Sequence, residues 1–427
     1  MNSFDPQNIP NQFPGVAIPP NRIKPGSTSS KPAGYSPQQI RRAYEIEPLI
    51  RSGITGKNQN IAIIVGFGSP TVENDLQVFS QQFGLPPAKL NIYYPDGQPS
   101  QVVPDWTLET AIDTQWVHAL APDATIHLVV AVSSAAGDLF SAVNFANNNL
   151  DVQVVSMSWG LPDSSFEQMF DHFFQKSGTV YLAASGDIGG KVTYPSASPF
   201  VVSVGGTTLL LRQNGSRIAE TGWNGSGGGP SLFVPKPNYQ IGFVSGGKRG
   251  TPDVSFVGDL ATGVSVFSST PIPDGSTGWV VAGGTSVGTP CWAGIIALAD
   301  QIRNVPLTDG HQELYNLAKG SQYARNYNDI TVGCAGNFCC TPGYDFVTGL
   351  GTPRANLLVR ALGNDPDPVD DESEDLESSS EDLESSSEDF EESSSEDESS
   401  SEHGHHHHHP DPPPHHHHHD HDESSTD

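Results

Sequence analysis

The feature that most constrains the fold of this chain is a series of short apolar runs separated by segments of helical periodicity. Five runs have the length and composition of buried strands, namely Asn60–Val65, Ile126–Ala131, Val152–Ser158, Thr179–Ala184 and Val201–Val204. Stretches such as Leu108–His118 and Leu139–Asn147 lie between them and repeat their apolar residues at helical spacing. Strands that alternate with helices of this length predict βαβ units. We therefore expect an α/β fold, a three-layer sandwich with a mostly parallel central sheet and helices on both faces.

Further segments fit the same pattern. Asn74–Phe83 and Phe166–Gln175 predict helices, and Ile92–Tyr94 predicts a short strand. The glycine-rich stretch Asn224–Phe233 is interpreted as a flexible surface turn.

Composition divides the chain into three parts. Residues 1–34 contain seven prolines and predict an extended, flexible arm. Residues 35–362 form the predicted folded domain. Residues 363–427 carry 24 of the 49 acidic residues, no Lys or Arg, and a seven-residue repeat, so we expect this tail to be disordered. Without the tail the chain is only mildly acidic, and no basic region indicates nucleic-acid binding.

The tail also holds 12 of the 16 histidines, including two runs of five on either side of Pro410–Pro414. Such runs could bind Zn²⁺, Cu²⁺ or Ni²⁺ loosely. A solvated tail without a bound metal is the favoured alternative.

The sequence gives few indications of the cellular location of the protein. The first 25 residues lack the apolar core of a signal peptide, and no stretch is long and apolar enough to span a membrane. Four cysteines are present; Cys334, Cys339 and Cys340 share one loop, where one short disulfide is possible.

One serine stands where a nucleophile would be exposed at a strand end. Gly283–Pro290 follows the apolar run Gly278–Ala282 and precedes a helical segment. Ser286 would then lie at a helix N-terminus, where its amide favours a developing negative charge. An ordinary helix cap is the alternative function for this serine.

A serine nucleophile needs a base, and the sequence favours a carboxylate over a histidine. The histidines outside the tail are His118, His127, His172 and His311, and none lies in a setting typical of a catalytic base. Glu109 and Asp113 are four residues apart, so they share one helix face. Their mutual repulsion would let one hold a proton near neutrality. A solvated acidic face is the alternative, although Trp116 and its apolar neighbours favour burial.

A third acid, Asp187, directly follows the predicted strand Thr179–Ala184. A protonated aspartic acid can donate a hydrogen bond to an oxyanion. The alternative is a simple Gly-Asp turn.

These motifs together resemble the sedolisin family of serine-carboxyl peptidases. The resemblance covers about residues 35–362 and rests on motifs in the family's order, which are Glu109-x-x-x-Asp113, Ser185-Gly186-Asp187, Tyr194-Pro195-Ser196, Val204-Gly205-Gly206-Thr207, Pro252-Asp253-Val254-Ser255 and Gly284-Thr285-Ser286-x-x-x-Pro290. It implies a subtilisin-like fold and an acid-active endopeptidase or tripeptidyl peptidase. In that family pattern Ser286 is the nucleophile, Glu109 the base, Asp113 its orienting residue and Asp187 the oxyanion-hole acid. Ser158-Trp159-Gly160 resembles the strand that pairs with extended substrate.

The resemblance also implies a structural Ca²⁺ ion. Its ligands would be the carboxylates of Asp329 and Asp345 and the carbonyls of Ile330, Thr341 and Gly343. The family usually has glycine where Thr341 stands.

Family members are generally made with a long N-terminal prodomain, which this sequence lacks before Tyr35. Three explanations would account for the missing prodomain. The sequence is a mature-like form, the protein folds without a prodomain, or it is a degenerate relative of the family. We expect the protein to be a monomer whose partners are polypeptide substrates. The family indicates an extracellular or acidic compartment. A histidine-based subtilisin lacks a suitable histidine. A catalytically silent fold that binds peptides, or metal through its tail, is the alternative to an enzyme.

Overall fold

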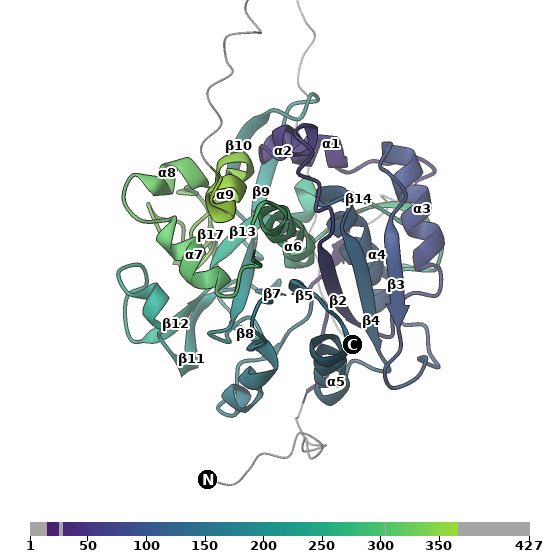
Figure 1. The fold of residues 1–427 in the computed structure, drawn as a ribbon, viewed down its shortest axis with the longest axis horizontal. Helices are drawn as coiled ribbons and strands as arrows, with labels where there is room; N and C mark the ends of the chain where they lie inside the picture. The colour runs from purple at the N-terminus through teal and green to yellow at the C-terminus, as the bar shows by residue number, and fades with distance from the viewer. Residues whose placement is uncertain (1–14, 25–28, 304, 366–427) are drawn as a thin grey trace, which may run out of the picture. The chain divides into compact units, whose positions relative to one another are not determined.

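An eight-stranded sheet forms the centre of the protein. The computed structural model describes residues 15–24, 29–303 and 305–365 (Figure 1). The strand order is β10-β9-β7-β5-β2-β4-β3, and β13 pairs along β9. Only β10 runs antiparallel to its neighbour. Their bounds are β2 Asn60–Gly66, β3 Lys89–Tyr93, β4 Thr125–Ala131, β5 Val154–Met157, β7 Val180–Ala184, β9 Val201–Leu211, β10 Arg217–Gly222 and β13 Val254–Val257. The predicted parallel sheet is confirmed.

Shorter strands lie outside this sheet. Among the described residues β1 (Arg22–Ile23) pairs with β15 (Gly278–Gly283), which also pairs with β14 (Val264–Ser268). The others pair two by two: β6 Leu161–Pro162 with β8 Thr193–Tyr194, β11 Gly229–Pro235 with β12 Lys248–Thr251, β16 Tyr327–Asn328 with β19 Thr352–Pro353, and β17 Cys334–Ala335 with β18 Phe338–Cys339.

Two almost completely buried helices, α4 (Pro104–Leu120) and α6 (Thr285–Ile302), pack against each other. Helix α6 also contacts β2, β5, β7, β9 and β13, while α5 (Ala136–Asn149) packs on β2 and β4. Figure 1 shows α5 and α6 on opposite sides of these strands, as expected for a sandwich. The remaining helices are α1 Pro37–Ala43, α2 Glu47–Arg51, α3 Val72–Phe83, α7 Gly310–Asn316, α8 Gln322–Asn326 and α9 Ala355–Gly363, with short 3₁₀ segments at Asn238–Gln240 and Leu260–Thr262.

A missing side chain lets α4 and α6 approach closely. A Cβ added to Gly294 of α6 would lie 2.8 Å from the Cβ of Leu120 in α4. This contact fixes how the two helices sit relative to each other, and with them the acids of α4 and the serine of α6.

The helix predicted at Phe166–Gln175 is present, as the 3₁₀ helix Glu167–Phe174. Phe170 and Phe173 both stack on Phe140, with ring centroids 4.9 and 5.4 Å away, and their spacing of three residues is one 3₁₀ turn.

The glycine-rich stretch is not a flexible surface turn. Its second half belongs to β11, and Ser226 is fully buried. A Cβ added to Gly227 would lie 2.3 Å from the carbonyl oxygen of Ser185, so glycine is needed where this loop crosses the end of β7.

Part of the predicted arm is described, and Gly15–Lys24 lies against the folded domain in extended form. Residues 1–14 and 366–427, with the acidic repeat and the histidine runs, lie outside the described residues. The domain boundaries and the tail's properties therefore remain predictions. No helix within the described residues has both the length and the apolar character needed to cross a bilayer.

Candidate active site

Ser286 and Glu109 meet in the buried interior between α4 and α6. Ser286 lies in the first turn of α6, and its hydroxyl donates to Oε2 of Glu109 at 2.9 Å. Both residues are fully buried. Burial, and then the charge of Asp113, raise the pKa of Glu109 well above its usual value. The serine hydroxyl thus faces a carboxylate whose raised pKa favours the uptake of a proton.

Asp113 lies one helical turn beyond Glu109, as the sequence predicted. Its Oδ1 accepts a hydrogen bond of 2.6 Å from the hydroxyl of Ser158, while its Oδ2 is buried without a partner. Burial raises the pKa of Asp113 well above its usual value, and the Ser158 bond opposes the rise. A proton on Asp113 therefore belongs on Oδ2. With that proton in place, Glu109 can ionise beside a neutral neighbour.

Asp187 follows β7 and is held by the residue next to Ser286. Its Oδ1 accepts from the amide of Thr285 at 2.8 Å and from the Thr285 hydroxyl at 3.0 Å. Burial raises the pKa of Asp187 to about 7, against the hydrogen bonds from Thr285 and the charge of Arg22. Because Oδ1 accepts both hydrogen bonds from Thr285, Oδ2 is the oxygen left to carry a carboxyl proton, although the Arg22 guanidinium 3.5 Å away opposes that proton. In that state Asp187 is a hydrogen-bond donor beside Ser286.

None of the four histidines outside the tail replaces this base. His118 bonds to the carbonyl of Pro86, His127 to Tyr93 and Asn60, and His172 to the carbonyl of Met169. His311 lies 3.7 Å from Asp253. Each is engaged away from Ser286, so the carboxylate at Glu109 is the base that the geometry offers.

The predicted substrate strand follows β5. Ser158 supports Asp113, as described above, and the indole of Trp159 is fully buried and donates to the carbonyl of Ile64 at 3.2 Å. Gly160 exchanges two backbone hydrogen bonds of 3.3 Å with Ile18. Of the three residues, Gly160 therefore presents its backbone to an extended segment.

The predicted calcium ligands lie in a separate loop region. Asp329 follows β16, and its carboxylate accepts from the amide of Gly343 and from the hydroxyl of Tyr323. Asp345 is buried and accepts from the amides of Thr341, Val347 and Thr348. Ile330 is also buried. No cluster of three His, Cys, Asp or Glu side chains suited to a metal occurs in the described part of the chain.

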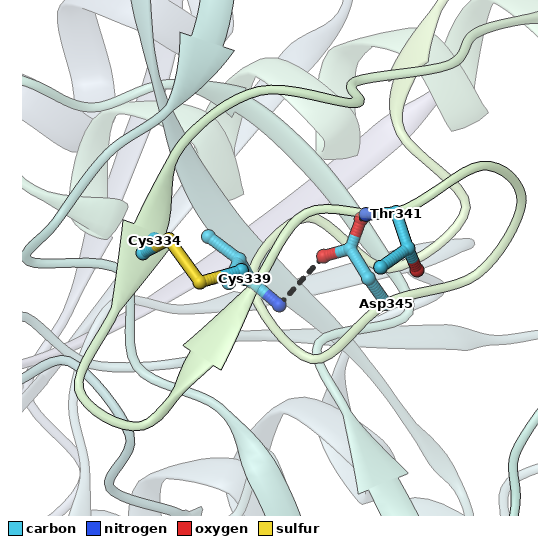
Figure 2. Close-up of a disulfide and its surroundings, with 5 residues drawn as sticks. Cys334, Cys339, Thr341 and Asp345 are labelled. Carbon is cyan, nitrogen blue, oxygen red and sulfur yellow. Dashed lines mark hydrogen bonds between the residues drawn. A yellow bond between two sulfur atoms is a disulfide. The ribbon is translucent and has the colours of Figure 1, made fainter.

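A disulfide closes this loop region. Cys334 and Cys339 are bonded, and Figure 2 shows them beside the loop that carries Thr341 and Asp345. Cys340 and Cys291 are buried thiols outside any disulfide. The one short disulfide that the sequence allowed is thus the pairing of Cys334 with Cys339.

Three residues at the site were not expected from the sequence. Thr285 orients Asp187, and its place inside the Gly-Thr-Ser motif was a usable signal. Asn21 donates to Oε2 of Glu109 at 2.7 Å, and Arg22 lies 3.5 Å from Oδ2 of Asp187. Both belong to the predicted flexible arm, where no pattern pointed to a contact with the site.

Comparisons with known proteins find similarity to peptidases. The model of the subtilase family matches residues 108–315. Kumamolisin from a Bacillus species is 31% identical over 79% of this chain and 65% of its own length. Tripeptidyl-peptidase 1 of Dictyostelium discoideum is 28% identical over 76% of this chain and 58% of its own. The chain thus spans about two thirds or less of these relatives.

A solved structure resembles the fold. Pseudomonas sedolisin, described as a serine-carboxyl proteinase complexed with pseudo-iodotyrostatin, superposes with a TM-score of 0.68 at 23% identity. The match covers 79% of this chain and 99% of that one. At this identity the likeness establishes the fold, a subtilisin-like sandwich.

Proposed function

Because this chain belongs to the sedolisin family, we propose that it is a serine-carboxyl peptidase that hydrolyses peptide bonds in acid through an acyl-enzyme on Ser286. The observation that carries the proposal is the 2.9 Å hydrogen bond from the Ser286 hydroxyl to the buried Glu109. Either an endopeptidase or a tripeptidyl peptidase is compatible with this chemistry.

Acylation uses the four residues Glu109, Asp113, Asp187 and Ser286. Glu109 takes the proton from Ser286 as the serine oxygen bonds to the substrate carbonyl carbon. The carbonyl oxygen becomes an oxyanion, which accepts hydrogen bonds from the Ser286 amide and from protonated Asp187. Collapse of this intermediate breaks the C–N bond, and Glu109 gives its proton to the leaving amine. Asp113, which burial keeps neutral and Ser158 orients, lets Glu109 alternate between its protonated and ionised states.

Deacylation repeats these steps with water. Glu109 takes a proton from the water that attacks the acyl carbon, and the same donors stabilise the second oxyanion. Glu109 then returns the proton to the serine oxygen as the ester breaks, which releases the carboxylic acid and restores Ser286.

The substrate is expected to be an unfolded polypeptide bound in extended form. Gly160 offers one backbone donor and one backbone acceptor to such a strand, because it already pairs in this way with Ile18. We propose that Ser158 orients Asp113 and that Trp159 packs beneath the strand that pairs with substrate.

A Ca²⁺ ion is proposed for the loops around Tyr323. Asp329 Oδ1 and the Gly343 carbonyl both lie within hydrogen-bond reach of the Tyr323 hydroxyl, at 3.1 and 3.4 Å. Hard oxygen donors that converge in this way fit Ca²⁺. With Asp345 and the carbonyls of Ile330 and Thr341 they would hold the ion, which would brace these loops and take no part in the reaction.

Cleavage of an unfolded protein between pH 3 and 8 tests the proposal. The wild type should cleave in acid, and Ser286→Ala should fold normally but lose at least about a thousandfold in kcat. Glu109→Gln should lose activity similarly. Equal cleavage by wild type and Ser286→Ala would contradict the mechanism. No cleavage by a folded, calcium-loaded wild type would favour the alternative of a peptide-binding or metal-binding protein.

A further inference from the structure

The hairpin formed by β17 and β18 lies against the loop that carries Asp187. Residues 334–339 are called the disulfide hairpin below, and residues 187–190 the Asp187 loop. We propose that the disulfide hairpin positions Asp187 for oxyanion stabilisation, so that the oxidation state of its disulfide controls the rate of the reaction. This proposal rests on the proposed function, because that function makes Asp187 a hydrogen-bond donor.

Backbone atoms make the contact between the two segments. Gly336, at the tip of the hairpin, has a φ of 57°, and a Cβ added there would lie 2.6 Å from the carbonyl oxygen of Gly189 and 2.8 Å from Cα of Gly190. A Cβ added to Gly189 would in turn lie 2.8 Å from the amide nitrogen of Gly336. Backbones that approach this closely leave little room for either segment to shift without the other.

Hydrogen bonds fix the two ends of the Asp187 loop. The amide of Gly227 donates to the carbonyl of Gly186 at 2.8 Å, and the amide of Gly228 donates to the carbonyl of Lys191 at 2.8 Å. The tip of the hairpin lies against the middle of the loop, two residues after Asp187. A displaced hairpin would therefore loosen the middle of the loop while its ends stay in place, and the Asp187 carboxyl would lose its alignment.

The disulfide constrains a hairpin that is very short. Its strands have two residues each, which pair Cys334 with Cys339 and Ala335 with Phe338. A two-stranded hairpin alone is marginally stable at best in water. Ala335 and Phe338 pack in a small apolar cluster that is separate from the main core. Because the S–S bond joins the two strands (Figure 2), its reduction should free the tip of the hairpin.

A dithiol reductant would act on this bond alone. Cys334 and Cys339 are exposed, whereas Cys291 and Cys340 are buried thiols and complete the four cysteines of the chain. Exchange with a dithiol breaks the S–S bond, leaves two cysteine thiols and converts the dithiol to its own disulfide. The effect of the reductant on activity therefore reports on the disulfide hairpin.

Loosening the loop should change the titration of Asp187 as well as its position. Burial is the main cause that raises the pKa of this carboxyl to about 7. The charged groups that interact with it are Arg22 from β1 and Glu109 from α4, and neither belongs to the hairpin. Water beside a loosened loop would weaken the effect of burial, so the pKa should fall. The alkaline limb of activity should then move to lower pH.

Two adjacent residues of the hairpin provide a matched pair of variants. Gly336→Ala places a Cβ against Gly189 and leaves the disulfide in place. Asn337→Ala, at the next and exposed position, adds no atom to the contact. The double variant Cys334→Ser/Cys339→Ser reproduces the loss of the bond, and added dithiol should not change it further.

Cleavage of an unfolded protein, below the melting temperature of every variant, tests the positioning role. Reduced wild type, Cys334→Ser/Cys339→Ser and Gly336→Ala should each lose about ten- to a hundredfold in kcat at an unchanged KM, because a misplaced oxyanion donor weakens only the transition state. Their alkaline limb should lie at lower pH, whereas Asn337→Ala should match the oxidised wild type. Variants that melt lower but keep the wild-type kcat and alkaline limb would overturn the proposal.

Amide hydrogen exchange of residues 186–191 gives a second readout that needs no catalysis. Exchange should be faster, on the order of tenfold, in reduced wild type and in the two loosened variants, while residues 108–118 of α4 keep their rate. An unchanged rate in the loop would also overturn the proposal. Faster exchange in a chain that cleaves nothing in any state would support the hairpin's hold on the loop and contradict the peptidase, so the two failures are distinguishable.

Discussion

At Asp187, a single buried carboxyl links pH to both activity and stability. The acid must be protonated to donate to an oxyanion, and burial raises its pKa to about 7. Activity should therefore be lost as the pH rises through about 7, which a pH profile of kcat/KM measures. The Arg22 charge holds this pKa down, so Arg22→Ala should move the alkaline limb to higher pH. An unchanged limb would contradict this assignment.

Stability should follow the same titration. The folded pKa of Asp187 lies above the ordinary aspartate pKa of 3.8, so the stability that the protonated group contributes is complete below pH 3.8 and lost as the pH rises through about 7. Three pKa units correspond to about 4 kcal/mol. Asp187→Asn removes the charge, and urea unfolding should find the variant gaining stability relative to wild type between pH 4 and 8. A constant difference would show that Asp187 does not titrate in this range.

Asp253, in the motif Pro252-Asp253-Val254-Ser255, serves stability instead of chemistry. Arg249 donates to its two carboxylate oxygens at 2.7 and 2.5 Å, and both residues are fully buried. Although burial alone would raise the pKa of Asp253, Arg249 and His311 hold it below its usual value. Asp253→Asn leaves a buried, unpaired arginine and should cost about 3–5 kcal/mol in denaturant unfolding. Arg51→Gln, at an exposed pair with Glu47, should cost under about 1 kcal/mol.

At the scale of elements, the contact between α4 and α6 sets the position of base against nucleophile. A Cβ at Gly294 would meet Leu120 at 2.8 Å, whereas one at Gly137 in α5 meets nothing within 4 Å. Gly294→Ala should cost about 1–3 kcal/mol and lower kcat, because it separates Glu109 from Ser286. Gly137→Ala should be neutral or stabilising by up to about 1 kcal/mol. Thermal melts and kcat for the two variants would check this, and similar values for both would contradict it.

For the molecule as a whole, the proposed calcium ion predicts a dependence on chelators. EDTA should lower the melting temperature of the wild type, and added Ca²⁺ should restore it. Asp329→Asn should melt lower and respond less to either treatment. A melting temperature that changes with neither EDTA nor Ca²⁺ would contradict the proposed Ca²⁺ ion.

Much of this architecture could be predicted, because buried strands and helices leave periodic patterns. Helix spacing made Glu109 and Asp113 candidates, and the places of Asp187 and Ser286 after strands made them candidates too, but their catalytic roles came from the resemblance to the sedolisin family. The partner of Asp113, Ser158, could not be inferred, since that bond joins residues 45 positions apart. The contacts of Asn21 and Arg22 could not be predicted from the sequence either, because extended backbone pairing leaves no side-chain pattern. A helix was predicted at Glu167–Phe174, but its 3₁₀ type was not, because its aromatic spacing also fits an α-helix.

The hydrogen bond between Ser286 and Glu109 joins residues that are 177 positions apart in the chain. During synthesis, the ribosome delivers the base long before the nucleophile, and neither has a function without the other. This contact is strongly non-local, and non-local contacts slow the folding of a chain. A chain whose synthesis has not yet passed Ser286 therefore lacks the nucleophile of the proposed hydrolytic centre.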